Sequence, residues 1–136
     1  MPDLETIPDQ DCVKLLRSHQ VGRIALVDEE SHPLIFPVNY FFDEGVVVFR
    51  TDPGTKLDLA PGAHVSFEID GWEPESAAGW SVVVKGICHD ITAPDDARSQ
   101  RMHYWPVRPV APGAKEHWIG VWANQISGRR FGPAGC

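Results

Sequence analysis

Residues 33–51, PLIFPVNYFFDEGVVVFRT, contain two predicted strands joined by a turn. Aliphatic and aromatic residues recur at every second position of the first strand, which is the period of a half-buried strand. Its buried face is expected to carry Leu34, Phe36, Val38, Tyr40 and Phe42. The triplet DEG at 43–45 is a hairpin signal, and the β-branched run VVVFRT follows it. The stretch therefore predicts an antiparallel β-hairpin.

Further strands are predicted on both sides of this hairpin. They are GRIALVD (22–28), AHVSFEID (63–70), GWSVVVKGICHDI (79–91) and HWIGVWANQISGRRF (117–131). The third is expected to be the longest strand, with Gly86 as a bulge or bend. A short helix capped by Thr6 is expected over residues 6–19, a helical or loose segment over 94–102, and a proline-rich surface loop over 104–117. About six strands in meander order predict a mainly β, antiparallel barrel with a few short helices.

Length and composition set limits on the class of protein. The 136 residues fit a single domain, 1–136, with residues 1–7 and 132–136 expected to be frayed ends. A net charge of −7 argues against nucleic acid as a partner. Cys12, Cys88 and Cys136 are odd in number and scattered, which favours a reducing, cytoplasmic setting. The sequence shows no secretory signal or membrane-spanning stretch, so no membrane partner is expected.

One cationic turn stands out in this acidic chain. In FRTDPGTKL, residues 49–57, a strand ends at Thr51, a Pro-Gly turn follows, and a helix is predicted to begin near Thr55. Backbone N–H groups at a helix start attract anions, and Arg50, Lys56 and the two threonines could add donors. The alternative, in which Thr55 only caps a helix and the cations are solvated, is equally supported by the spacing. A Walker phosphate loop is absent.

Signals for catalysis by side chains are few. The chain has no GxSxG, HExxH or paired CxxC pattern, so neither a catalytic nucleophile nor a metal site is predicted. Pro37 interrupts an otherwise regular strand, which confines it to an edge or a bulge. Tyr40, Trp72, Trp80, Trp118 and Trp122 could stack on a flat ligand, although each is more simply explained by packing. If the protein is an enzyme, a cofactor is expected to carry the chemistry.

The ordered set GRIA, PVNY, FRTDPGTKL and GWSVVVKG resembles the pyridoxamine 5'-phosphate oxidase-like, FMN-binding split β-barrel family, in its small actinobacterial-type branch. The resemblance covers residues 8–131. It implies a homodimer with FMN in two clefts between the protomers. It also implies cofactor-binding residues in four groups: Arg50, Thr51, Thr55, Lys56 and Leu57 at the phosphate; Pro37, Val38, Asn39 and Tyr40 along the ring edge; Trp80, Ser81 and Lys85 from the other subunit; and Trp118 on the far side of the ring.

The resemblance implies an oxidoreductase that passes hydride or electrons through the flavin to a small-molecule acceptor, with NAD(P)H as a candidate donor. The C-terminal SGRRFGPAGC lacks the characteristic pattern of the family's oxidases, so production of pyridoxal phosphate is not expected. The alternatives are a deazaflavin-dependent reductase, which the acidic net charge disfavours, a non-catalytic flavin carrier or sensor, and a barrel that binds partners without a cofactor. Haem is a less favoured cofactor. Catalytic residues are not assigned.

Overall fold

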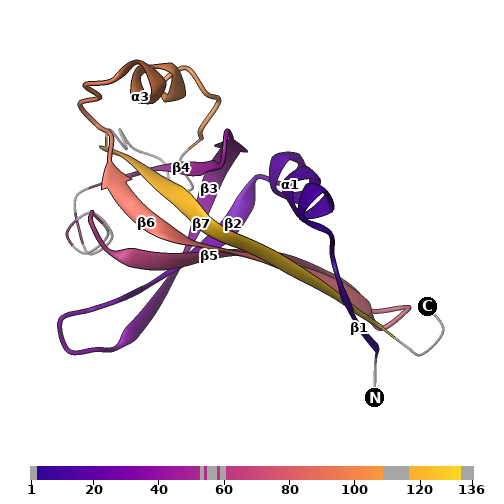
Figure 1. Ribbon diagram of the computed structural model, residues 1–136. Coiled ribbons are helices and arrows are strands. Elements are labelled where there is room, and N and C mark those ends of the chain that lie inside the picture. The colour runs from indigo at the N-terminus through magenta and orange to yellow at the C-terminus, as the bar shows by residue number, and fades with distance from the viewer. Residues whose placement is uncertain (1–2, 53, 55–57, 59–60, 109–116, 133–136) are drawn as a thin grey trace.

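The computed structural model describes residues 3–52, 54, 58, 61–108 and 117–132. Most of these residues lie in long antiparallel strands (Figure 1). The strands are β1 (Asp3–Thr6), β2 (Val21–Val27), β3 (Pro33–Asp43), β4 (Val46–Thr51), β5 (His64–Glu73), β6 (Ala78–Asp90) and β7 (His117–Gly132). The helices whose bounds lie within the described residues are α1 (Asp9–Ser18) and α3 (Ala97–Met102). The protein is mainly β, as the sequence predicts.

Six strands close into a barrel. Their order is β7-β4-β3-β2-β5-β6, and an additional pairing of β6 with β7 completes the ring. All these pairings are antiparallel. The β6–β7 register shifts between Lys85 and Gly86, which confirms the bulge expected at Gly86. The predicted antiparallel barrel is therefore confirmed, and β7 is its central strand because it pairs with β1, β4 and β6.

The hairpin of β3 and β4 forms as its sequence predicts. Asp43 is opposite Val46, and the two turn residues Glu44 and Gly45 both have positive φ, 52° and 77°. Two successive residues with positive φ match a turn whose twist suits antiparallel strands, and Gly45 adopts this conformation at little cost. The alternation in β3 is also confirmed, because Val38, Tyr40 and Phe42 are buried.

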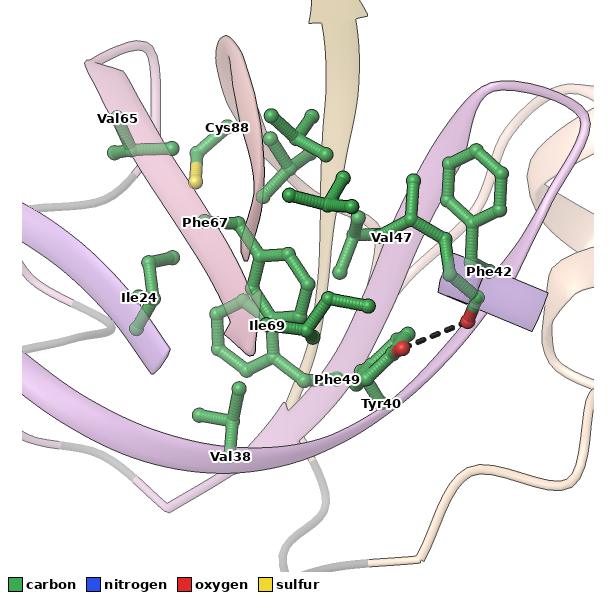
Figure 2. Close-up of a cluster of buried hydrophobic side chains, with 14 of the residues drawn as sticks. Ile24, Val38, Tyr40, Phe42, Val47, Phe49, Val65, Phe67, Ile69 and Cys88 are labelled. Carbon is green, nitrogen blue, oxygen red and sulfur yellow. Dashed lines mark hydrogen bonds between the residues drawn. The ribbon is translucent and has the colours of Figure 1, made fainter. Parts of the chain in front are cut away.

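Two hydrophobic clusters hold the fold together. The larger fills the barrel and includes Phe49, Phe67 and Ile69, whose side chains converge in Figure 2. The smaller, here called the outer cluster, lies on the opposite face of β4 and β7 and contains Val46, Val48, Ile91, Met102 and Val107. The chain segment 91–108, here called the strap, covers this outer face and includes α3.

The strap is anchored to the turn of the β3–β4 hairpin. Arg98 donates to the backbone carbonyl of Glu44, and Arg101 lies 3.2 Å from the carboxylate of the same residue. Asp96 caps α3 by accepting from the Ser99 backbone N–H at 2.6 Å. These contacts fix the strap against one end of the barrel, as Figure 1 shows for α3.

Three local predictions were wrong. Asp3–Thr6 is a strand rather than a frayed end, because it pairs with β7 beyond the end of β4 and the next residue, Ile7, is buried in the core. Gly132 likewise belongs to β7. Thr6 does not cap α1, whose N-cap is Pro8 without a side-chain hydrogen bond. The longest strand is β7, with 16 residues against 13 in β6.

Candidate functional site

Arg50 and Asn39 lie on the same outer face of the sheet, on adjoining strands. The last β3–β4 pair is Tyr40 with Phe49, whose side chains point into the core. One step further along, Asn39 and Arg50 therefore point outward, since side chains alternate along a strand. Arg50 is in turn opposite Trp118 on β7. The antiparallel registers thus bring together Asn39, Arg50 and Trp118, all three of which were predicted from the sequence to bind the cofactor.

The Arg50 guanidinium is held by several contacts. Its Nη1 donates to the Val107 carbonyl of the strap at 3.3 Å, and its Cζ lies 5.1 Å from the centroid of the Trp118 ring. The Trp118 ring also stacks on His103, with centroids 4.4 Å apart and planes 15° from parallel. Arg50 is therefore half-buried and oriented rather than freely solvated.

The remaining residues of the cationic turn are only partly described. Thr51 is buried at the end of β4, and its hydroxyl donates to the Asp52 carbonyl at 3.2 Å. Thr55, Lys56 and Leu57 lie outside the described residues. The described part of the predicted anion site therefore consists of Arg50 and Thr51.

Along β3 the predicted ring-edge residues divide between the two faces of the sheet. Pro37 and Asn39 face outward, whereas Val38 and Tyr40 are buried in the core. Residues 33–39 pair with β2, and pairing with β4 begins only at Tyr40. Pro37 therefore occupies a part of β3 with a single described strand partner, as expected for a residue without a backbone donor.

The Tyr40 side chain takes a structural role. Its hydroxyl donates to the Leu16 carbonyl of α1 at 2.7 Å, the dashed contact in Figure 2, and its ring meets Phe67 edge-on at 4.8 Å. Burial raises the pKa of the Tyr40 hydroxyl, which therefore stays protonated. The Tyr40 backbone N–H is engaged as well, because it donates to the Gln20 carbonyl at 2.9 Å.

Trp80, Ser81 and Lys85 lie far from Arg50 within one chain. Trp80, Ser81 and Lys85 are opposite Arg130, Arg129 and Gln125 of β7, whereas Arg50 is opposite Trp118. Twelve, eleven and seven steps along β7 therefore separate them from Arg50. At about 3.3 Å per residue these steps correspond to roughly 40, 36 and 23 Å measured along the strand. Trp80 packs at the far end, where its ring contacts His19 edge-on at 4.9 Å. A single chain does not bring all of the predicted residues into one site.

Three hollows each contain part of the predicted set. One of about 250 Å³ lies between α1, β3 and the strap, and it is lined by Arg17, His19, Gln20, Asn39, Tyr40, Phe41, Phe42, Pro106 and Arg108. A second, of about 320 Å³, includes Trp80, and a third, of about 330 Å³, includes Lys85. Sequence reasoning missed the basic lining of the first, because the end of α1 and residue 108 are distant in the chain and carry no local motif.

Part of the sheet's outer face is left uncovered by the residues that the structure describes. It is here called the open face, and among its residues are Ser81, Lys85 and four apolar side chains that are 56–65% exposed, namely Val21, Val27, Ile35 and Trp72. Arg23 lies at its centre, 3.4 Å from both Glu68 and Asp70. Burial and the neighbouring Asp70 raise the pKa of Glu68. Exposed apolar side chains on one face of a sheet make that face a candidate interaction surface.

Within the described ranges no cluster of His, Cys, Asp and Glu side chains has the arrangement of a metal site. None of the helices described is both long and apolar enough to cross a membrane. Cys12 and Cys88 are buried free thiols. The chemistry-bearing features of the described structure are therefore the cationic end of β4, the basic hollow and the open face.

Comparisons with known proteins match this architecture. The family model described as pyridoxamine 5'-phosphate oxidase matches residues 8–130. An FAD-binding protein of Mycobacterium smegmatis has 34% identity and a TM-score of 0.75, over 93% of this chain and 97% of its own. An FAD-binding protein of Mesorhizobium loti has 25% identity and a TM-score of 0.71, over 93% and 97%. An uncharacterized protein of Mycobacterium tuberculosis, Rv0080, is 34% identical across 70% of this chain and 67% of its own. The chain therefore belongs to the pyridoxamine 5'-phosphate oxidase family.

Proposed function

We propose that this protein is a flavin-dependent oxidoreductase that binds FMN, or the larger FAD, at the outer end of β4. The observation that carries the proposal is the position of Arg50 beside Asn39, on one face and at the point where β3 loses its pairing with β2. A guanidinium binds phosphate through paired donors, and a strand with one partner offers backbone groups to a flat ring edge. Two relatives of this chain bind FAD.

The described residues fit the phosphate end of such a cofactor. Arg50 is half-buried and fixed in orientation, and it supplies a permanent positive charge in a chain of net charge −7. Thr55, Lys56 and Leu57 are proposed to complete the phosphate site. The β3 segment Pro37, Val38, Asn39 and Tyr40 is proposed to lie along the ring edge and to offer it backbone groups and the Asn39 amide. The bound flavin would supply hydride or electron transfer, and this chain's residues would hold and orient it.

We further propose that the cleft is shared by two copies of the chain. Along β7, twelve, eleven and seven strand positions separate Trp80, Ser81 and Lys85 from Arg50, which sets them apart from the anion site of their own protomer. A second copy packed on the open face would bring its own set of these residues to the first. The exposed apolar side chains on that face would be covered by the same contact.

A small-molecule acceptor with NAD(P)H as donor is the proposed pairing, in a cytoplasmic setting that agrees with the free thiols of Cys12 and Cys88. No general acid or base is assigned to the site.

The test of cofactor binding is a titration of flavin-free protein with FMN and with FAD, followed by quenching of flavin fluorescence. Arg50→Ala is expected to weaken binding by about 2 kcal/mol, or roughly thirtyfold, the typical loss of a charge-assisted hydrogen-bond partner. Arg98→Ala is the matched control, because Arg98 also packs on a tryptophan of β7. A wild-type protein that binds neither flavin would refute the proposal.

Two further measurements address the rest of the proposal. Oxidation of NADPH with nitro or quinone acceptors tests turnover, and its absence with flavin bound would favour the non-catalytic carrier. Light scattering with Ile35→Arg, which places a charge on the open face, tests the shared cleft. A monomeric wild-type protein that still binds flavin tightly would contradict the dimer.

A further inference from the structure

The Trp118 ring contacts both Arg50 and His103, and neither contact could be anticipated from the spacing of these residues in the sequence. We propose that Trp118 and His103 form a positioning stack that orients Arg50 toward the cofactor phosphate. The inference rests on the proposed flavin site and assigns to Trp118 a role different from a wall of the flavin ring. In this proposal His103 holds the Trp118 ring in place, and the Trp118 ring in turn holds the Arg50 guanidinium.

His103 is fixed on the strap side of the stack. Its Nε2 lies within hydrogen-bonding distance of the Ile91 carbonyl. Because a carbonyl only accepts, Nε2 carries the proton and donates. The imidazole plane is then set by this bond, and it lies nearly parallel to the indole of Trp118. His103 therefore presents a fixed flat surface to the tryptophan.

The backbone of Trp118 is held by the start of the strap. Its N–H donates to the Thr92 hydroxyl at 3.0 Å, and its carbonyl accepts from the Ile91 N–H at 2.9 Å. Together with the stacking on His103, these bonds leave the indole little freedom. An immobile aromatic face beside a guanidinium restricts the arginine to fewer rotamers.

Restriction of Arg50 matters because a free arginine side chain loses much conformational freedom when it binds. Contacts made before binding reduce the entropy lost on capture of an anion. The Val107 carbonyl accepts one guanidinium N–H at 3.3 Å, and the indole supports the guanidinium at 5.1 Å. The stack is thus expected to raise phosphate affinity without touching the phosphate.

Trp122 provides a matched control within the same strand. It lies four residues further along β7, is also half-buried against the outer cluster, and packs with an arginine, Arg98, at 5.7 Å and with His89 at 4.7 Å. Trp118→Leu and Trp122→Leu therefore remove similar amounts of packing from the same cluster. Only the first removes support from Arg50.

The experiment compares affinities for FMN and for riboflavin, which lacks the phosphate. In Trp118→Leu, FMN affinity is expected to fall about fivefold to tenfold while riboflavin affinity is unchanged. Trp122→Leu is expected to alter neither. In an Arg50→Ala background, Trp118→Leu should have no further effect, because the coupling runs through the arginine.

The pair His103→Ala and His103→Phe tests the stack without removing the tryptophan. His103→Phe keeps a flat ring but loses the bond to the Ile91 carbonyl, so it is expected to lower FMN affinity less than His103→Ala does. Equal losses of FMN and riboflavin affinity, or additive effects with Arg50→Ala, would overturn the proposal in favour of a purely structural role. A wild-type protein that binds no flavin would instead refute the proposed function, so the two failures are distinguishable.

Discussion

Replacement of Tyr40 by phenylalanine separates the structural role of this residue from a role in ligand binding. The substitution deletes one hydroxyl and keeps the ring that packs edge-on against Phe67. The hydroxyl donates at 2.7 Å to the Leu16 carbonyl in the last turn of α1. Carbonyls in that turn have no partner within the helix, so Tyr40 satisfies a group that the helix cannot.

The magnitude follows from the burial of both partners. Tyr40 is 3% exposed and Leu16 is 0% exposed, so water cannot readily replace the lost donor. An unsatisfied buried carbonyl costs about 1–3 kcal/mol. Because phenylalanine fills the same space, no cavity adds to this loss. We therefore expect the free energy of unfolding to fall by about 1–3 kcal/mol while flavin affinity stays unchanged.

The assay is urea unfolding followed by tryptophan fluorescence, with flavin titration of the same samples. A lower midpoint at an unchanged denaturant slope reports a loss of stability alone. Tyr104→Phe is the matched control, because Tyr104 is the other tyrosine of the chain and is 90% exposed. The reasoning would be refuted if Tyr40→Phe lost flavin affinity and kept its stability.

Two further substitutions test local features of β5 and of the strap. Gly71→Ala is expected to displace the Trp80 indole and change its fluorescence, because the added Cβ would lie 2.3 Å from Nε1; an unchanged spectrum and melting temperature would contradict this packing. Asp96→Ala is expected to reduce the acid sensitivity of the melting temperature. The hydrogen bond from the Ser99 N–H lowers the pKa of Asp96 below its ordinary value of 3.8, so its stabilisation is present at neutral pH and lost as the pH falls through the folded-state pKa. A pH profile identical to that of the wild type would count against this reading.

The sequence predicted the features that depend on neighbouring residues. The β3–β4 hairpin could be read directly, because its alternation and its turn chemistry lie within nineteen residues, 33–51. The strand character of Asp3–Thr6 could not be read, since these residues carry no β pattern and are ordered by the free edge of a strand more than a hundred positions later. Pairing with β7 therefore determines the conformation of Asp3–Thr6 more than their own β propensity does.

The candidate site shows the same division. Arg50 and Asn39 were identified by motif, and the registers place them side by side. The contacts of Arg50 with Val107 and Trp118 come from the strap and the last strand, which no local pattern connects with β4. Tyr40 was predicted to bind the ligand because it belongs to the PVNY segment. Only the position of α1 shows that its hydroxyl already donates to the Leu16 carbonyl.

The central place of β7 has a consequence for how the chain reaches its native state. Both barrel partners of β7, β4 and β6, precede it in the sequence, so each exposes an unpaired edge until residues 117–132 arrive. Closure therefore waits for the last described strand and depends on contacts between distant positions, which slows folding. During synthesis on the ribosome, the apolar edge of β4, VVVF, is exposed to other nascent chains over that interval. We expect chaperone dependence and aggregation to increase when translation is slowed just before residue 117.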